Sequence, residues 1–172
     1  MIIDDEDDIM PSTKLAIRVA DEVWIAAALL QREHPSKKDF SVEEIRARAE
    51  EEGVSGELRP GVYVHIIQHC VANRPPNPGR YRMLFETGKT RRRLFRPGDS
   101  YNPAREDSKT TPAKEDIPAK YQFLLDWYNA EYVQRKPNAQ TDPLLSLRGS
   151  GKKIWAGEHA DEYVRRLREG WE

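Results

Sequence analysis

The sequence predicts a mainly α-helical fold with one small β-hairpin, followed by an extended C-terminal arm that ends in a short helix. Apolar residues recur at three- and four-residue steps in several segments, which is the spacing of an amphipathic helix. Two short runs of aromatic and aliphatic residues flank a polar, glycine-containing turn, which indicates a hairpin. Beyond residue 141 the chain is too apolar to stay in solvent and too short to fold alone, which indicates an arm.

Composition limits the class of protein. The chain has 172 residues, 38% of them hydrophobic, and its 28 Lys and Arg nearly balance its 29 Asp and Glu. This fits one domain with appendages, including an acidic, disordered tail over residues 1–11. No stretch approaches the ~20 apolar residues of a membrane span, and the acidic start is the opposite of a signal peptide. A cytoplasmic location is therefore expected. The single cysteine, Cys70, excludes an internal disulfide and a cysteine-built zinc site.

The first helix is expected over residues 12–33. Ser12 is expected to cap its start and Pro35 to end it. One helical stripe collects the apolar residues of this segment, which are Ala16, Val19, Ala20, Val23, Ala27 and Leu30.

The second helix has the clearest start signal in the chain. Ser41 and Glu44 form a capping box, and Phe40 and Ile45 stand at the positions of a hydrophobic staple. The helix is expected to stop at Gly53.

A third helix is expected to begin near Pro60 and Gly61, to run through Val71 and to end before Pro75. β-branched residues dominate this segment, so a strand is a competing prediction. Pro60 suits the first turn of a helix, and Val62 and Ile66 are four residues apart, which favours the helix.

The hairpin is expected to consist of residues 81–85 and 92–95, joined by a turn over residues 86–90. The polar residues 98–116 are predicted to form a long surface loop. A fourth helix over residues 117–135 precedes a linker at 136–141, and a last short helix is expected over 160–169.

This order of elements is that of a winged helix-turn-helix domain, expected over residues 12–135. In that fold the third helix enters the major groove of DNA and the hairpin contacts the backbone. Residues 80–105 hold eight basic and two acidic residues. Consecutive arginines at a turn repel one another and a polyanion relieves that repulsion, which favours duplex DNA over a hairpin that contacts protein or nothing. The predicted DNA-binding residues are Tyr63, His65, Gln68, His69, Asn73, Arg80, Arg82, Lys89, Arg91, Arg92, Arg93 and Arg96.

The sequence predicts no catalytic, cofactor or metal site. His65 and His69 have a zinc-compatible spacing but lack a third ligand. The segment 149–152 departs from a phosphate-binding loop because Ser146 and Lys153 stand where that motif needs glycine and a hydroxyl residue. No nucleophile has a placed base, so no enzymatic activity is expected.

Residues 142–172 are predicted to form a partner-binding arm. Tyr163, Leu167 and Trp171 form one helical stripe, and Trp155 and Trp171 are the expected anchors. The alternatives are that the stripe docks on the chain's own domain or on a second copy. The predicted partner-binding residues are Leu144, Leu147, Arg148, Lys152, Lys153, Ile154, Trp155, Tyr163, Leu167 and Trp171.

Two stretches resemble known families. Residues 40–98, especially Arg59-Pro60-Gly61-Val62, Gln68-His69-Cys70 and Asn77-Pro78-Gly79-Arg80-Tyr81-Arg82, are similar to an uncharacterised family of bacterial winged-helix domains, which implies only a fold. A second block, near the C-terminal end, resembles the toxin-binding tail of VapB-type antitoxins. It consists of Asp142-Pro143-Leu144-Leu145, Leu147 to Lys152, Ile154-Trp155, Asp161 to Val164 and Leu167 to Trp171.

The second resemblance implies a function. It implies a partner toxin with a PIN-type ribonuclease fold, whose carboxylate cluster holds magnesium and receives a basic side chain of the antitoxin tail. Arg148, Lys152 and Lys153 stand nearest the matching position, and the sequence does not choose among them. Such antitoxins normally carry a smaller DNA-binding module than the one predicted here.

The expected function is therefore that of an antitoxin that neutralises a PIN-type toxin through its arm and binds operator DNA through its winged helix. One alternative is a stand-alone transcriptional regulator whose tail serves dimerisation. Another is an accessory DNA-binding module of a nucleic-acid-processing system. Either a homodimer or a hetero-oligomer is compatible with the sequence.

Overall fold

The computed structural model describes residues 17–135 together with Arg165, Arg168 and Glu169. The chain divides into two units at Val133 and Gln134. The predicted tail at 1–11, the linker at 136–141 and nearly all of the arm at 142–172 lie outside the described residues. The three described residues of the arm have helical backbone and fall in the segment 160–169, for which a helix is predicted.

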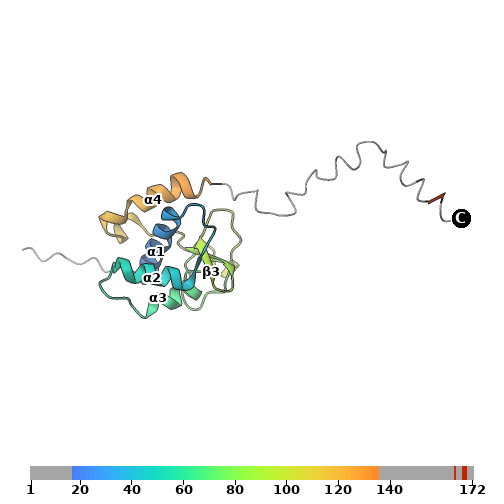
Figure 1. Ribbon diagram of the computed structural model, residues 1–172. Helices are drawn as coiled ribbons and strands as arrows, with labels where there is room; N and C mark the ends of the chain where they lie inside the picture. Colours follow the sequence, from blue (N-terminus) through green and yellow to red (C-terminus); the bar gives the residue numbers. More distant parts are fainter. Residues whose placement is uncertain (1–16, 136–164, 166–167, 170–172) are drawn as a thin grey trace, which may run out of the picture. The chain divides into compact units, whose positions relative to one another are not determined.

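The first unit begins with three helical segments and a short strand (Figure 1). Helix α1 spans Val19–Glu33, strand β1 spans Phe40–Ser41 and helix α2 spans Val42–Glu52. Helix α3 spans Gly61–Val64 and continues without a break into η1, a π-helical segment at His65–His69.

The sheet has three antiparallel strands in the order β1-β3-β2. Strand β2 spans Leu84–Gly88 and strand β3 spans Arg91–Leu94, and the two form the hairpin. Phe40 of β1 pairs with Arg92 of β3, so the chain segment between α1 and α2 is tied to the hairpin. A bulge between Glu86 and Gly88 shifts the register close to the turn.

After the hairpin the chain forms short helical turns before its last helix. These are the 3-10 turns η2 at Pro103–Arg105, η3 at Lys114–Asp116 and η4 at Ala119–Tyr121. Helix α4 spans Phe123–Trp127 and continues as η5, a π-helical segment at Tyr128–Tyr132.

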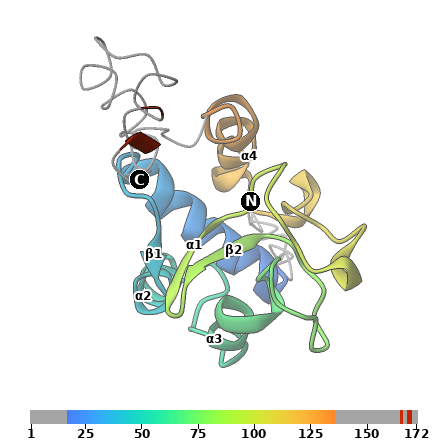
Figure 2. The same cartoon turned by 90° about the vertical axis from the view of Figure 1, so that its right-hand side faces the viewer.

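Helix α1 lies at the centre of this unit (Figure 2). It contacts α2, α3, α4 and β3, and most of its side chains are buried. Trp24 is fully buried and its ring meets Tyr128 of η5 edge to face, with ring centroids 5.7 Å apart. Burial of apolar surface around α1 is therefore what holds the other elements in place.

The capped second helix is confirmed. The Ser41 hydroxyl accepts from the Glu44 amide, and the Glu44 carboxylate accepts from the Ser41 amide. Gly53 ends α2 in the left-handed conformation, with φ of 52°. Phe40 and Ile45 of the expected staple are both buried.

Several predicted boundaries are wrong. Helix α1 begins at Val19 after an Arg18 that makes no side-chain cap, and not at Ser12. The third helix ends at His69, two residues before Val71, through which it was expected to run. The two strands extend into the segment expected to be the turn, so the turn contains only Lys89 and Thr90. Thr87 belongs to β2, where it is the extra residue of the bulge.

The predicted surface loop over residues 98–116 and the predicted long last helix also need correction. The loop contains turns η2 and η3, and its Arg105 is fully buried. The last helix begins at Phe123, because Pro118 caps a separate 3-10 turn. The predicted apolar face of that helix is otherwise found, since Leu124, Tyr128 and Tyr132 are buried.

Candidate interaction surface

Arg91 pairs with an acidic partner inside the fold. Its Nη2 lies 2.6 Å from Oδ1 of Asp39, and the same group donates to the Asp39 main-chain carbonyl at 2.9 Å. The Thr87 hydroxyl donates to the other oxygen of Asp39. These contacts hold the pKa of Asp39 below its usual range, against the opposing effect of its burial.

Arg92 is buried, with 1% of its side chain exposed. Its guanidinium donates to the carbonyls of Ile66, Gly88 and Arg91, and Glu86 lies 3.6 Å away. Because successive side chains of a strand point to opposite faces, Arg92 is directed to the opposite side from Arg91 and Arg93.

Arg93 forms a two-pronged pair with Asp99, with N–O distances of 2.6 and 2.7 Å. Its guanidinium also covers the Phe85 ring at 4.5 Å. The expectation that Arg91, Arg92 and Arg93 form an unrelieved cluster is therefore wrong. Residues distant in sequence, and main-chain carbonyls, already compensate the three charges.

Two further predicted DNA contacts pack on aromatic rings. The Arg82 guanidinium lies 4.4 Å from the Tyr101 ring and donates to the Ser108 carbonyl. The Arg96 guanidinium lies 4.3 Å from the Tyr132 ring. Both arginines are half-buried, so they tie the hairpin to the segments that follow it.

The polar residues of the third helical segment are likewise used within the fold. Gln68 donates to the Pro75 carbonyl at 2.6 Å. Asn73 donates to the Glu86 carbonyl and accepts from the Glu86 amide, so it occupies the edge of β2.

The two histidines of this segment contact each other. Nδ1 of His65 lies 2.8 Å from the Gly61 carbonyl, and its ring meets the His69 ring edge to face at 4.7 Å. Burial lowers the pKa of His65, so this ring is neutral at pH 7. Groups of three or more residues able to hold a metal ion are absent from the part of the chain that the structure describes.

Within residues 17–135, three of the twelve predicted DNA-binding residues have a side chain that is exposed and makes no hydrogen bond, ion pair or ring contact. Tyr63 is 45% exposed. Arg80 and Lys89 are exposed and have no ion pair or hydrogen bond within residues 17–135.

Sequence reasoning missed Arg105. This side chain is fully buried and donates to the carbonyls of Arg74, His69, Tyr81, Gln68 and Pro75. Two of these carbonyls belong to the C-terminal end of η1, where helix carbonyls have no helical partner. The sequence carries no local signal for this role, because the acceptors are main-chain atoms 24 to 37 residues away.

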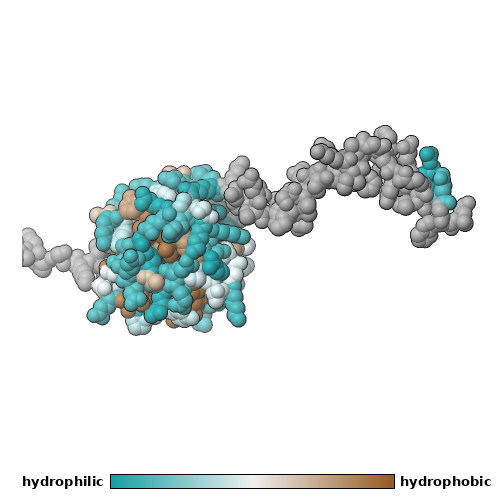
Figure 3. Space-filling view, viewed as in Figure 1, coloured by the Kyte–Doolittle hydropathy of each residue, from teal (hydrophilic) through white to brown (hydrophobic). Residues whose placement is uncertain are grey.

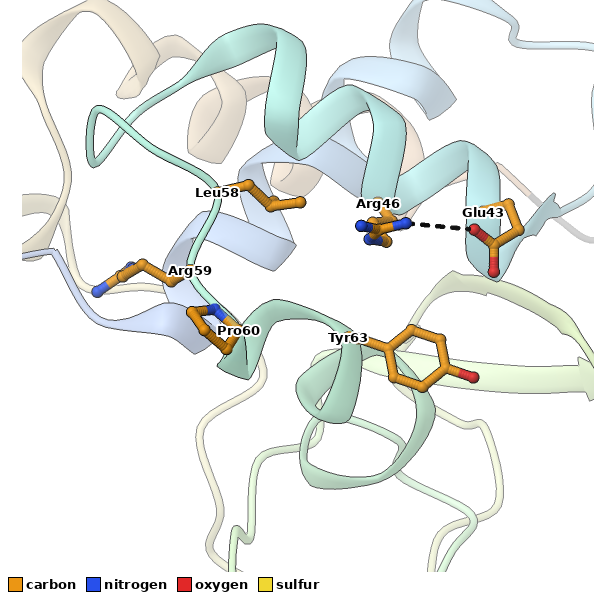
Figure 4. Close-up of a pocket in the computed structure, with 6 residues that line it drawn as sticks. All are labelled: Glu43, Arg46, Leu58, Arg59, Pro60 and Tyr63. Atoms are coloured by element: carbon orange, nitrogen blue, oxygen red, sulfur yellow. Dashed lines mark ion pairs between the residues drawn. The ribbon is translucent and has the colours of Figure 1, made fainter.

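A pocket opens between α2 and the start of α3 (Figure 4). It is lined by Glu43, Arg46, Leu58, Arg59, Pro60 and Tyr63. The Leu58 side chain is directed into the space between the two helices, and Arg46 pairs with Glu43 at 3.9 Å.

Arg59 is held at the back of this pocket by a buried ion pair. Its Nε donates to Oε2 of Glu22 at 2.9 Å, and its Nη1 donates to the Ile17 carbonyl at 2.8 Å. The Glu22 side chain is fully buried and also accepts from the Ser55 hydroxyl. The charge of Arg59 is therefore matched within the fold.

The surface of residues 17–135 is predominantly hydrophilic on the face seen in Figure 3, with separate small hydrophobic patches. The large apolar or aromatic side chains most exposed among the described residues are Tyr63, Val64, Tyr101 and Phe123. Two of these four, Tyr63 and Val64, are adjacent in sequence on α3, and Tyr63 lines the pocket.

The predicted partner-binding residues lie outside the described residues, so no contact is assigned to them. Comparison with protein-family models, with curated proteins and with solved structures finds no match to this chain. Among the described residues there is no helix with the length and apolar character needed to cross a membrane.

Proposed function

We propose that this chain is an antitoxin-like protein in which residues 142–172 bind and neutralise a PIN-type ribonuclease. The observation that supports this is the block of leucines, glycine-flanked cations and tryptophans between Leu144 and Trp171, which resembles the toxin-binding tail of VapB-type antitoxins.

Neutralisation is proposed to work by occlusion. Trp155 and Trp171 supply large apolar anchors, which dominate the binding energy of many interfaces. A cation from Arg148, Lys152 or Lys153 then competes with magnesium, or with the substrate phosphate, for the carboxylates of the ribonuclease. This chain performs no reaction in the proposed complex.

The first unit is proposed to be a winged-helix domain. Three features support this: the order α1, β1, α2, α3, β2, β3, the antiparallel pairing of β1 with β3, and a hairpin formed by β2 and β3. In this proposal α3 with η1 corresponds to the recognition helix by its position in the chain only, and the turn at Lys89 is the tip of the wing.

The test is co-purification with the product of the neighbouring gene, expressed together with this chain. We expect a stable complex that lacks ribonuclease activity, and a chain that ends at Gln140 should neither bind nor inhibit. Trp155→Ala should weaken the complex by tenfold or more, at about 1.4 kcal/mol for each factor of ten.

Trp127→Ala is not a suitable control, because Trp127 belongs to the core. Phe123→Ala removes an exposed aromatic ring of the first unit instead and should leave inhibition unchanged. Inhibition by the chain that ends at Gln140 would exclude the antitoxin proposal. A loss of dimerisation in that chain, without any ribonuclease partner, would favour the regulator whose tail serves dimerisation.

Binding of duplex DNA is a second candidate function, and the free cations Arg80 and Lys89 favour it. Lys89 occupies the hairpin turn, where a wing meets the DNA backbone. Each phosphate contact adds about one unit to the slope of log affinity against log salt concentration.

The test of this candidate is a salt titration of DNA binding. Lys89→Glu and Arg80→Glu should each lower that slope by about one unit. Lys114→Glu, at an exposed position in η3, is the matched control. Equal slopes in the parent and in both variants would remove the hairpin and Arg80 from DNA recognition.

A further inference from the structure

The surface formed by α2 and the start of α3 combines exposed apolar side chains with exposed carboxylates. We define it as the α2–α3 face, made of the pocket residues Glu43, Arg46, Leu58, Arg59, Pro60 and Tyr63 together with the neighbouring Glu50, Glu57 and Val64. Its elements are fixed by packing, because Ile45 and Ala49 of α2 and Val62 of α3 are buried.

The centre of the α2–α3 face is apolar. Tyr63 and Val64 are 45% and 40% exposed, although most aromatic and β-branched side chains of this unit are buried. Leu58 and Pro60 line the adjoining pocket. Two adjacent exposed apolar side chains beside a pocket have the arrangement of a binding anchor site.

The rim of the α2–α3 face is acidic. Glu43, Arg46 and Glu50 share one side of α2 because they are spaced by three and four residues. Glu43 has only the loose contact with Arg46, while Glu50 and Glu57 have no ion pair among the described residues. Arg59 is matched by Glu22, so the rim carries three carboxylates against the one guanidinium of Arg46.

We infer that the α2–α3 face is the docking site for a basic segment of another protein, which inserts an apolar side chain between α2 and α3 and places lysines or arginines against Glu43, Glu50 and Glu57. The apolar centre excludes water from the anchor, and the acidic rim complements the flanking cations. The exposed face of the Tyr63 ring also provides a site where a cation can stack.

The same chemistry argues against nucleic acid at this face. Phosphates require cations, and α2 carries five glutamates and two arginines. One of these arginines, Arg48, is engaged with Glu33, Glu51 and Glu52. A duplex laid along α2 and α3 would therefore meet uncompensated carboxylates. This inference concerns the first unit only and stands whether or not residues 142–172 bind a ribonuclease.

The experiment uses the full chain labelled with ¹⁵N and three probes. The first is a peptide of about 15 residues, long enough to form a helix, in which leucines at helical spacing are separated by lysines. The second has glutamate in place of every lysine. The third is a duplex of about 20 base pairs, or two turns of DNA.

We expect the leucine–lysine peptide to bind and to shift the amide resonances of α2 and of residues 58–64. The glutamate peptide should not bind. Tyr63→Ala should weaken binding of the lysine peptide by about tenfold or more. Phe123→Ala, which removes a similarly exposed ring outside the face, should bind as the parent does.

The charge contribution is tested separately, with variants at exposed positions that should fold normally. Glu50→Lys should weaken binding of the lysine peptide and flatten its dependence on salt, whereas Glu106→Lys, in the segment after the hairpin, should change neither. An unchanged affinity in both Tyr63→Ala and Glu50→Lys would overturn the inference. So would equal binding of the two peptides.

Other occupants of the face give different results. Resonance shifts of residues 58–64 caused by the duplex, with loss of duplex binding in Tyr63→Ala, would assign the face to nucleic acid. A parent chain that is dimeric by light scattering, and a Tyr63→Ala chain that is monomeric, would assign it to a second copy. Either result would overturn the inference.

Discussion

A hydrogen bond of 2.7 Å joins Nη1 of Arg105 to the main-chain carbonyl of His69, across 36 residues of sequence. Arg105 comes from the segment that follows the hairpin, and His69 is the last residue of η1. Among the described residues, the hydrogen bonds that this guanidinium donates go to main-chain carbonyls and not to a carboxylate. A positive charge at the C-terminal end of a helix is favoured by the helix dipole, so Arg105 fixes where the third helical segment ends.

We predict that Arg105→Lys destabilises the protein by about 3 kcal/mol, because the single ammonium group of a lysine cannot replace a buried planar fork that reaches five carbonyls. Urea denaturation followed by circular dichroism measures this change. Arg80→Lys, at an exposed position that has no ion pair within residues 17–135, should stay within about 0.5 kcal/mol of the parent. An Arg105→Lys chain as stable as the parent would show that the network contributes nothing.

The hairpin allows a second comparison, between Arg92 and Lys89. Arg92→Met should cost about 2 kcal/mol, because the carbonyl of Ile66, within η1, loses its side-chain donor. Glu86 keeps its hydrogen bonds from Arg74, so the Glu86 carboxylate still has a cationic partner in this variant. Lys89→Met should be neutral in stability. Thermal unfolding of both variants checks the expectation, and equal melting temperatures would contradict it.

Gly79 lies against His69. A Cβ atom at Gly79 would stand 2.7 Å from Cβ of His69 and 2.8 Å from its Cγ. His69 cannot move away freely, because its ring meets His65 and its carbonyl is held by Arg105. We therefore predict that Gly79→Ala destabilises by about 1–3 kcal/mol. Gly88→Ala is the control, since the nearest atom to its added Cβ would be Cγ of Arg91 at an ordinary 3.5 Å. Equal urea midpoints for Gly79→Ala and Gly88→Ala would contradict the steric argument.

The elements that the sequence predicted correctly are those with local signals. The capping box of Ser41 and Glu44 and the left-handed Gly53 lie within or next to the helix that they bound, so α2 was placed correctly. Helix α1 has no side-chain cap at its start at Val19, and Ser12, the cap that the sequence predicted, lies outside the described residues.

The roles of the basic residues depended on contacts that the sequence does not display. Arg91 meets Asp39 52 residues away, and the inward direction of Arg92 follows from the pairing of β3 with β1. The count of charges along the chain predicted an unpaired basic segment, whereas in the structure most of these arginines contact a carboxylate, a main-chain carbonyl or an aromatic ring. The α2–α3 face escaped prediction for the same reason: Leu58 and Tyr63 become neighbours of Glu43 only when α2 and α3 pack together.

Asp21 is a buried acid without a compensating partner. Only 1% of the residue is exposed, and neither carboxylate oxygen has a hydrogen-bond partner among the described residues. Burial raises its pKa to about 6, and the nearby Asp116 carboxylate adds to this, while Lys109 and Arg18 oppose it. The folded protein therefore holds this proton more tightly than the unfolded chain, in which the pKa is 3.8.

The sign of the pH effect follows from that difference. The contribution of Asp21 to stability is largest below about pH 4 and is lost as the pH rises through 6, a loss of roughly 2–3 kcal/mol. The lowered pKa values of Asp39, Glu44 and Glu86 act in the opposite direction, because their contributions are lost as the pH falls. A comparison of Asp21→Asn with the parent cancels these three groups.

We predict that the free energy of unfolding of Asp21→Asn, relative to that of the parent, rises by roughly 2 kcal/mol between about pH 4 and pH 7.5. Urea titrations across this range measure the difference in the free energy of unfolding between Asp21→Asn and the parent at each pH. The asparagine amide does not titrate, so its own effect on stability is the same at every pH. Asp126→Asn, at an exposed position on α4, should show no such trend. A difference between Asp21→Asn and the parent that stays constant with pH would mean that the Asp21 carboxylate titrates at its ordinary value and is solvated in the folded protein.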